Sequence, residues 1–258
     1  MKWLLVEDAE ELALTSAKRL LSSLQTHPSI VLGLPTGRTP EGMYRRIAEQ
    51  CASEYHCFRQ ATTFNLDEYV GVPGSHPGSY CSYMHRHLFD HVDLDPARIH
   101  IPDGLASSFL RSHPELSVDE ALAMECEQYE GNIARAGSLN LTFLGLGTNG
   151  HIGFNEPGTS FFSRTRMVEL SEATRTANAE FFSGQAVPRR AITIGIATIL
   201  ESTSIVLLAS GERKAEILRR FATEPGSESL PASALRHHPD VTIIADRAAA
   251  ALIDFNRL

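Results

Sequence analysis

Short apolar runs alternate with longer amphipathic segments along this chain, and that alternation constrains its fold more than any other feature. The runs are rich in β-branched residues, as strands buried on both faces are. They are WLLV, SIVLGL, ATTFNL, LNLTFLGL, SIVLLAS and VTIIAD. Strands separated by helices pair in parallel, because each crossover helix returns the chain to the same end of the sheet. The sequence therefore predicts an α/β fold, an open, mainly parallel, Rossmann-like sheet with helices on both faces.

The segments between the runs carry signals for helix starts. Asp8 is a favourable N-cap for a helix over about 8–25, and Pro40 suits the first position of a second helix over 40–53. Two more helices are predicted, one ending near Ala136 and one over 212–223. The stretch SGQAVPRRAITIGIATIL fits either a strand or the start of a helix, because alternating isoleucines precede TIL.

Length and composition favour one domain and a small-molecule partner. A chain of 258 residues without repeats or linkers fits a single domain over 1–258. Residues 103–120 mix Gly, Ser and Pro with acids, which predicts a surface excursion. The net charge of −8 argues against nucleic acid as a partner, because phosphate backbones bind basic surfaces.

The start of the chain and its cysteines indicate a compartment. MKWLLVEDAEE has too short an apolar run for a signal peptide or a membrane span, so a cytoplasmic protein is expected. The cysteines show no C-x-x-C spacing, and free, buried or partly buried thiols are expected. They are Cys51, Cys57, Cys81 and Cys126.

Ligands of open α/β sheets bind outside the carboxyl ends of the strands, and three loops at such ends are unusual here. The first, GLPTGRTPEG over 33–42, ends at a helix N-terminus and offers backbone N–H groups and the hydroxyls of Thr36 and Thr39. These groups suit a phosphate. The loop is not a Walker A motif, because Arg38 follows Gly37 where lysine is needed, and it also fits a plain capped turn.

The second loop, FNLDEYVG, places two carboxylates at the end of a buried strand. A partly desolvated carboxylate at the mouth of a site can take a proton from carbon, which makes Asp67 a candidate general base. Asp67 could equally cap the next turn. Glu68 is expected to be structural.

The third loop, GLGTNGHIGFNEP, contains the G-x-G-x-x-G pattern of dinucleotide-binding loops. Glycines and a proline soon after Gly150 forbid the helix that would hold a pyrophosphate, so no nucleotide is expected. The loop instead carries polar residues. His151 is a candidate proton shuttle whose tautomer Asn149 or Glu156 could fix, although a loop histidine is often only structural.

Histidines elsewhere do not form a convincing metal motif. His85, His87 and His91 lie in a stretch expected to be helical, where His87 and His91 would share a face. No H-E-x-x-H pattern or third ligand follows, so no metal site is predicted. Lys214 follows a strand and is by default a solvated helix lysine, but it could contact a phosphate.

Five motifs together resemble the glucosamine-6-phosphate deaminase family, in order and across nearly the whole chain. They are LGLPTGRTP, TFNLDEYVG, LGLGTNGHIGFNEPG, SRTR and PASALRHHPDVTIIAD. The resemblance implies the fold that these deaminases share with 6-phosphogluconolactonases. It also implies a reaction of amino-sugar catabolism that needs no metal, nucleotide or organic cofactor. That reaction converts glucosamine 6-phosphate and water to fructose 6-phosphate and ammonium.

The resemblance also implies roles for individual residues. Asp67 matches the base that moves a proton between C2 and C1 of the sugar. His151, with Asn149 and Glu156 to orient it, matches the group that opens the pyranose ring. The residues expected to hold the 6-phosphate are Thr36, Gly37, Arg38, Thr39 and Lys214.

Two departures from the family pattern concern the charges of the site. Asn149 stands where some members have aspartate, so the pKa of His151 should be raised less than in those members. Glu180 stands where the family commonly has arginine, and Arg38 replaces a glycine of the phosphate loop. We expect Arg38 to supply the missing cation and to pair with Glu180 when the site is empty.

The sequence also bears on the oligomeric state and on alternative substrates. Allosteric, hexameric members have a further C-terminal segment and a lysine at the place of Val168, so we expect no activation by N-acetylglucosamine 6-phosphate and a monomer or small homo-oligomer. Galactosamine 6-phosphate remains an alternative substrate, because the residues that distinguish C4 epimers cannot be placed. Less consistent alternatives are a 6-phosphogluconolactonase, which lacks FNLDEY and HIGFNEP together, and a non-catalytic sugar-phosphate sensor, which carries a basic helix-turn-helix.

Overall fold

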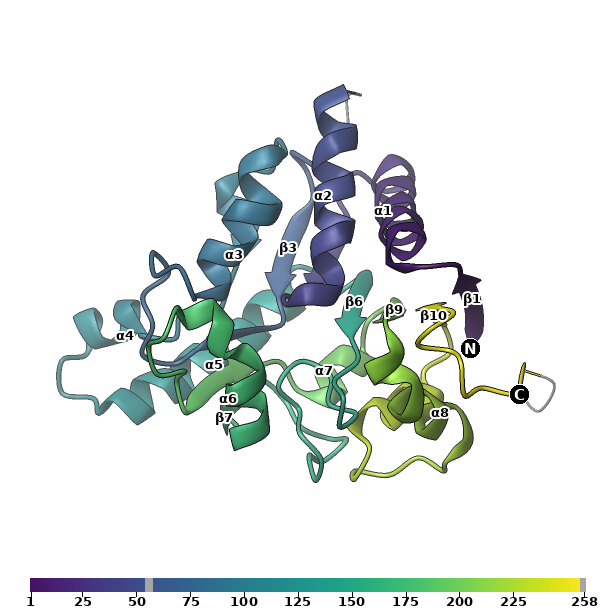
Figure 1. The fold of residues 1–258 in the computed structure, drawn as a ribbon. Helices are drawn as coiled ribbons and strands as arrows, with labels where there is room; N and C mark the ends of the chain where they lie inside the picture. Colours follow the sequence, from purple (N-terminus) through teal and green to yellow (C-terminus); the bar gives the residue numbers. More distant parts are fainter. Residues whose placement is uncertain (54–57, 256–258) are drawn as a thin grey trace.

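The computed structural model describes residues 1–53 and 58–255 of the chain, and its main sheet confirms the predicted fold class (Figure 1). Every strand pair of this seven-stranded sheet is parallel, in the order β1-β10-β9-β6-β2-β3-β5. All six strands expected from the apolar runs are present. The strands are β1 (Lys2–Val6), β2 (Val31–Leu34), β3 (Thr62–Asn65), β5 (Ile99–His100), β6 (Leu141–Gly145), β9 (Ser204–Ala209) and β10 (Val241–Asp246).

A second, smaller sheet was not expected from the sequence. Its strands pair antiparallel in the order β4-β8-β7 and are β4 (Asp67–Tyr69), β7 (Arg166–Glu169) and β8 (Arg190–Thr193). They are only three or four residues long and carry charged side chains, so no apolar run marks β4 or β7, and β8 lies in the stretch that fitted either a strand or a helix. This sheet continues directly from β3 and places Asp67 at its start.

Most helix predictions are confirmed. Asp8 caps α1 (Ala9–Thr26) by accepting the N–H groups of Glu10 and Glu11. The predicted start of α2 at Pro40 is wrong, because α2 (Arg38–Ser53) already begins at Arg38; proline is tolerated throughout a first helical turn, where no N–H is needed. The remaining predicted helices are α5 (Val118–Arg135) and α8 (Ala215–Thr223), which the short 3₁₀ turn η4 (Glu212–Lys214) precedes.

The stretch SGQAVPRRAITIGIATIL, which fitted either a strand or a helix, contains both. It forms β8 and then α7 (Ile196–Leu200), with Gly195 between them. Residues 103–120 form a turn, the short helix α4 (Ser107–Ser112) and the capped start of α5. Within this segment Ala106 is fully buried and packs with Ala121 and Ile192.

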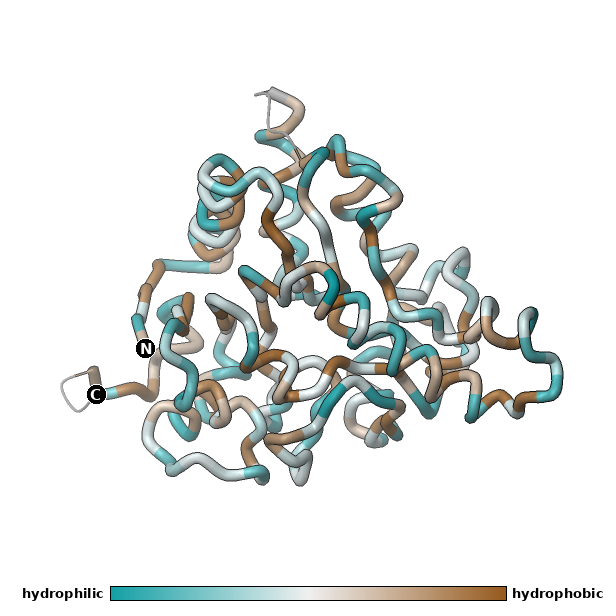
Figure 2. Tube along the Cα trace, turned by 180° about the vertical axis from the view of Figure 1, so that it is seen from behind, coloured by the Kyte–Doolittle hydropathy of each residue, from teal (hydrophilic) through white to brown (hydrophobic). Residues whose placement is uncertain are grey.

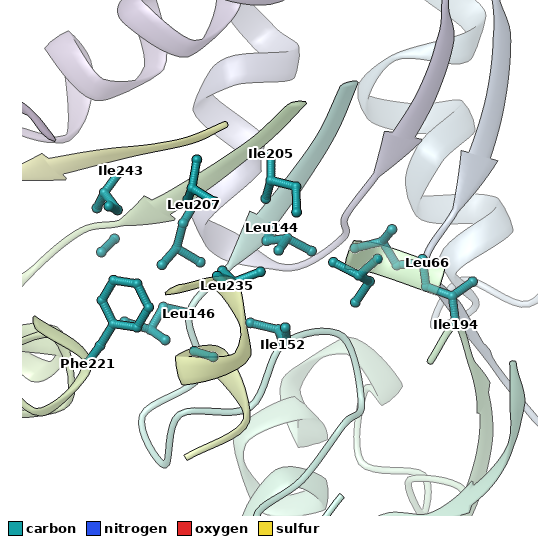
Figure 3. Close-up of a cluster of buried hydrophobic side chains, with 14 of the residues drawn as sticks. Leu66, Leu144, Leu146, Ile152, Ile194, Ile205, Leu207, Phe221, Leu235 and Ile243 are labelled. Carbon is teal, nitrogen blue, oxygen red and sulfur yellow. The ribbon is translucent and has the colours of Figure 1, made fainter. Parts of the chain in front are cut away.

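Two apolar layers cover the main sheet. On one face α1, α2 and α3 (Tyr80–His87) pack against side chains such as Leu32 and Phe143. On the other face α5, α7 and α8 pack against Leu144, Ile205 and Leu207, and Figure 3 shows this cluster. Hydrophilic and hydrophobic positions alternate along the helices in Figure 2. This pattern is expected for helices that pack one side against a sheet and expose the other side to solvent.

The state of the cysteines and the length of the helices agree with what the sequence predicts. Cys51, Cys81 and Cys126 are free and buried or partly buried as predicted, and Cys57 lies outside the described residues. Within residues 1–53 and 58–255, each helix is too short or too polar to cross a membrane.

Candidate active site

Loops that follow four parallel strands meet at the carboxyl edge of the main sheet. β2 lies between β3 and β6, so the chain continues from β2 toward one edge of the sheet and from β6 toward the other. Such a switch point opens a crevice between the loops. A cavity of about 790 Å³ lies there, lined by residues of the loops after β2, β3, β6 and β9. The predicted site residues among its lining are Thr36, Gly37, Arg38, Thr39, Asp67, His151 and Lys214.

Asp67 is a buried carboxylate at the first position of β4, and it faces the cavity. Its Oδ1 atom has no hydrogen-bond partner among the described residues. Burial, and then the charge of Glu68, raise the pKa of Asp67 to about 8, although a hydrogen bond with the Thr36 side chain lowers it. A carboxyl group of this kind holds a proton near neutral pH and gives it up readily, as an acid–base catalyst must.

Glu68 has a structural role, as the sequence suggested. Its carboxylate accepts the backbone N–H groups of Tyr69, Tyr80 and Cys81 at 2.8, 3.0 and 2.8 Å. Burial raises the pKa of Glu68 to about 7, while these three bonds lower it. The bonds fix β4 to the N-terminus of α3 and thereby hold Asp67 at the cavity.

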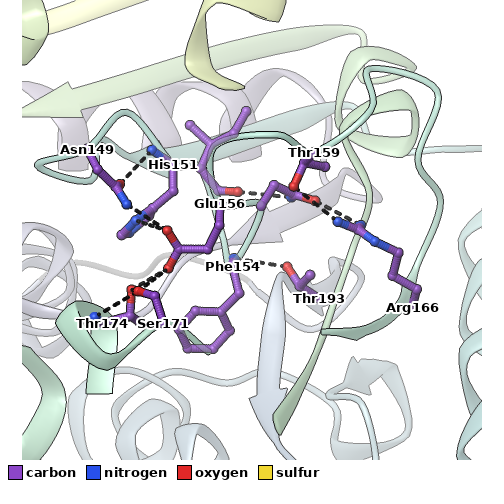
Figure 4. Close-up of polar contacts among 11 residues, drawn as sticks. Asn149, His151, Phe154, Glu156, Thr159, Arg166, Ser171, Thr174 and Thr193 are labelled. Carbon is purple, nitrogen blue, oxygen red and sulfur yellow. Dashed lines mark hydrogen bonds and ion pairs between the residues drawn. The ribbon is translucent and has the colours of Figure 1, made fainter. Parts of the chain in front are cut away.

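The loop after β6 positions His151 through a chain of polar contacts (Figure 4). The Asn149 side chain accepts the backbone N–H of His151 at 3.2 Å and donates to Glu156 Oε2 at 2.6 Å. Ser171 and Thr174 donate to the other carboxylate oxygen of Glu156. Asn149 and Glu156 thus lie behind His151 rather than on the cavity wall.

The imidazole of His151 turns its Nδ1 edge toward Glu156. The Nδ1–Oε2 distance is 3.8 Å, and Nδ1 has no hydrogen-bond partner among the described residues. Burial lowers the pKa of His151, the Glu156 charge raises it, and Lys214 lowers it, for a net lowering. Burial therefore outweighs the carboxylate, and the comparison with family members that have aspartate at position 149 stays a prediction. A neutral imidazole can accept a proton near pH 7.

The glycines of this loop make room for the imidazole. A Cβ atom on Gly147 would lie 2.5 Å from the His151 ring, so only glycine fits there. After β6 the chain forms turns, and the next helix, α6 (Glu172–Asn178), begins far beyond the loop. The prediction that no helix begins directly after Gly150 is therefore confirmed.

Two further loops bring together the residues predicted to hold a phosphate. Residues 35–39 line the cavity at the N-terminus of α2, where unpaired N–H groups and the helix dipole favour an anion. Lys214 lies opposite in η4 and is partly buried rather than solvated, and burial and Arg213 lower its pKa to about 8. Asp246 holds this second loop by accepting the Ser210 hydroxyl at 2.5 Å and the Gly211 N–H at 2.9 Å.

Arg38 and Glu180 form the ion pair expected from the sequence. The Arg38 Nε atom lies 2.5 Å from Glu180 Oε1, across 142 positions of the chain. Glu180 belongs to the 3₁₀ turn η3 (Ala179–Phe182). About half of each side chain is exposed to solvent, so the pair is weak enough for another anion to displace it.

One wall of the cavity was not predicted from the sequence. α6 and η3 contribute Thr176, Ala177, Asn178 and Phe181, which follow no apolar run or motif. The only sequence signal in this region was the unusual Glu180. Among the described residues, none of 103–120 lines the cavity.

The histidines near α3 are arranged differently from the prediction. α3 ends at His87 and a separate 3₁₀ turn, η1 (Phe89–His91), follows, so His87 and His91 do not share a face of one helix. His85 Nδ1 lies 2.8 Å from Asp90 Oδ1. Across residues 1–53 and 58–255, groups of three or more His, Cys, Asp or Glu that could hold a metal ion are absent.

Similarity to known proteins covers almost the whole chain. The sequence profile described as glucosamine-6-phosphate isomerases/6-phosphogluconolactonase matches residues 6–244. A glucosamine-6-phosphate deaminase of Rhodopirellula baltica is 47% identical over 251 residues, which is 97% of this chain and 95% of that protein. Glucosamine-6-phosphate deaminase 2 of Bacillus subtilis is 47% identical over 253 residues, 97% of this chain and 96% of that protein.

Solved structures agree with the sequence relatives. A structure described as a monomeric glucosamine-6-phosphate deaminase is 44% identical with a TM-score of 0.90, covering 98% of this chain and 100% of the other. A 6-phosphogluconolactonase from Trypanosoma cruzi has a TM-score of 0.77 at 18% identity, covering 97% of this chain and 96% of that one, which shows a shared fold alone. This chain belongs to the glucosamine-6-phosphate deaminase family.

Proposed function

We propose that the protein is an enzyme that converts glucosamine 6-phosphate and water to fructose 6-phosphate and ammonium. The observation that carries this proposal is that one cavity is lined by a buried carboxylate, a neutral imidazole and the groups suited to a phosphate. Ring opening of a cyclic sugar phosphate, followed by proton transfer between two of its carbon atoms, would use all three elements. The names of the relatives at 47% identity support the same activity.

Ring opening is the step assigned to His151. A proton must leave the anomeric hydroxyl, and another must reach the ring oxygen, so that the C1–O5 bond breaks and a C1 aldehyde forms. The imidazole is suited to both transfers because it is neutral and next to the cavity. Glu156 at 3.8 Å stabilises the imidazolium that forms between the two transfers.

Isomerisation is the step assigned to Asp67. Its carboxylate takes the proton from C2 while the C2 ammonium group gives a proton to O1, so that an enolamine forms, and the same carboxyl group then returns its proton to C1. The resulting C2 imine adds water and releases ammonia, which leaves as ammonium, and the C2 ketone of fructose 6-phosphate remains. Every step is a proton transfer or a hydrolysis, so the proposed reaction requires no cofactor.

The proposed phosphate subsite consists of Thr36, Gly37, Arg38, Thr39 and Lys214. The phosphate would accept hydrogen bonds from N–H groups at the start of α2 and would form an ion pair with Lys214. We propose a monomer as the active unit, supported by the 44% identical relative described as monomeric.

Galactosamine 6-phosphate is retained as the alternative substrate, because the cavity residues that would face C4 are not established. A lactonase hydrolyses an ester and transfers no proton between carbon atoms, so the buried base would have no task in it. A sensor would likewise not need Asp67 and His151 in one cavity.

The test is ammonium release by the purified protein with glucosamine 6-phosphate, beside galactosamine 6-phosphate and unphosphorylated glucosamine. Turnover of the glucosamine ester alone is the expected result, because the proposed subsite requires a phosphate. Faster release from the galactosamine ester would reassign the epimer. Absence of ammonium release with all three sugars would overturn the proposal.

Arg38 is expected to exchange Glu180 for the substrate phosphate. Arg38→Ala should raise KM for glucosamine 6-phosphate by about three- to tenfold with little change in kcat, because a half-exposed charge-assisted bond is lost. Glu180→Gln should lower KM by about twofold, because Arg38 no longer has to leave a partner. Steady-state kinetics measures both values.

The matched control for this prediction is Arg45→Ala. Arg45 is also a half-exposed arginine of α2, paired with Glu10 at 2.5 Å, but it does not line the cavity. Its KM should equal that of the wild type. An unchanged KM for Arg38→Ala would remove Arg38 from the phosphate subsite.

A further inference from the structure

Two buried tyrosines contact the phosphate loop from behind. Tyr44 of α2 donates its hydroxyl to the Pro35 carbonyl oxygen at 2.6 Å, and Tyr83 of α3 donates to the Gly37 carbonyl oxygen at 2.7 Å. Their relative exposures are 0% and 4%, and neither lines the cavity. The two rings pack edge to face with centroids 6.4 Å apart. The tyrosines therefore contact the loop without access to a substrate.

These two bonds fix the direction of the loop's N–H groups. A trans peptide points its carbonyl oxygen and its N–H in opposite directions, and the described peptide bonds are all trans. Since the carbonyl groups of Pro35 and Gly37 point to the buried hydroxyls, the N–H groups of Thr36 and Arg38 point away from them. That direction leads to the cavity, which both residues line.

Gly37 makes this orientation easy to lose. Its φ is +96°, a region that favours glycine, and no heavy atom lies within 4 Å of where its Cβ would be. Because glycine has no side chain, it restricts rotation of the peptide plane that follows it less than any other residue does. Rotation would turn a carbonyl oxygen toward the cavity, where it would repel a phosphate dianion. Burial raises the pKa of both tyrosine hydroxyls, so they remain protonated donors.

We propose that Tyr44 and Tyr83 are positioning residues of the phosphate subsite, which hold the N–H groups of Thr36 and Arg38 toward the 6-phosphate. This inference rests on the proposed function and deepens it. It assigns the geometry of the subsite to two side chains that do not touch the substrate.

The experiment compares Tyr44→Phe and Tyr83→Phe with the wild type. Each variant keeps the buried ring and removes only the hydroxyl. Three quantities are measured: the steady-state constants for glucosamine 6-phosphate, the Kd of inorganic phosphate by calorimetry, and Tm. Tyr83→Phe should raise KM and the phosphate Kd by about three- to tenfold, because one buried hydrogen bond is lost, and it should leave kcat nearly unchanged. Tyr44→Phe should act in the same direction.

Tyr129→Phe is the matched control. The Tyr129 hydroxyl is also buried and donates to two backbone carbonyl groups, Asn65 O at 2.8 Å and His100 O at 3.0 Å, away from the phosphate loop. Its loss should lower Tm but leave the phosphate Kd unchanged.

The outcomes separate this inference from the proposed function. Equal phosphate Kd values for Tyr83→Phe and the wild type, or an equal weakening in Tyr129→Phe, would overturn the positioning role, even if the wild type releases ammonium. Weaker phosphate binding in Tyr83→Phe alone would support the role, even if the wild type releases none. A wild type that does not bind phosphate would overturn both.

Discussion

Asp67→Asn is expected to lower kcat for glucosamine 6-phosphate by about 10²–10⁴-fold, with a small change in KM. The amide has nearly the shape of the carboxyl group but cannot take the C2 proton. Binding should persist because the proposed phosphate subsite and His151 are untouched. The measurement is the initial rate of ammonium release. A variant that retains more than about a tenth of the wild-type kcat would show that Asp67 is not the base.

Stability distinguishes this loss from unfolding. Asp67 is buried, has an oxygen without a partner among the described residues, and has a raised pKa. Its carboxyl group therefore lowers the stability of the folded protein at neutral pH. Asp67→Asn should therefore leave Tm unchanged or raise it. Glu125→Gln is the matched control: Glu125 is also buried with a raised pKa, accepts the Asp103 N–H at 3.0 Å, and does not line the cavity. Its kcat should stay near that of the wild type.

The same carboxylate should set the pH dependence of kcat/KM. Asp67 must be deprotonated to act as a base, so activity should rise as the pH rises through its pKa of about 8. Lys214 must be protonated to bind the phosphate, so activity should fall as the pH rises through its pKa, also about 8. The profile should be bell-shaped with its maximum near pH 8. Lys214→Arg should remove the alkaline fall, because arginine keeps its charge.

His151→Gln is expected to lower kcat by about 10²–10⁴-fold for the cyclic substrate, because the imidazole transfers both protons of ring opening. The substitution should leave the Asn149–Glu156 contact in place, since that bond does not involve the ring. His85→Gln is the control, a half-exposed histidine that contacts Asp90 outside the cavity. Its activity should be unchanged.

Deuterium exchange separates the roles of His151 and Asp67. The wild type, supplied with fructose 6-phosphate and ammonium in heavy water, should introduce deuterium at the carbon that Asp67 protonates. This reverse reaction uses the open-chain ketone that is in equilibrium with the furanose ring of fructose 6-phosphate in solution, so His151→Gln should retain far more exchange than Asp67→Asn. Equal loss in both variants would show that His151 takes part in the C1–C2 proton transfer itself.

The main sheet could be predicted from sequence because its inner strands, β2, β6, β9 and β10, are buried on both faces. The run SIVLLAS has five consecutive apolar residues between two serines for that reason, and β9 is buried throughout. β4 carries Asp67 and Glu68, and β5 has only two residues, so neither has an apolar run. The antiparallel sheet was missed because contacts between distant segments, rather than its own residues, define it.

The candidate residues were predictable because strand order brings loop ends together. Parallel strands end at one edge of the sheet, so Asp67, His151 and Lys214 were expected to meet there, and they line one cavity. The direction of the His151 pKa was not predictable, because it depends on how deeply the ring is buried. Local sequence specifies charge and hydrogen-bonding capacity, but burial is a property of the packed chain.

The sequence by itself determined the parallel α/β fold and indicated the candidate phosphate loop with its glycine and the candidate acid–base residues at the strand ends, because periodicity and local chemistry carry that information. The tertiary structure alone decided the cavity wall formed by α6 and η3 and the contacts of Tyr44 and Tyr83 with the phosphate loop. Tyr83 lies 46 positions from Gly37, and no local pattern specifies which backbone carbonyl a buried hydroxyl will contact. That pairing is set by how α2 and α3 pack beside the sheet.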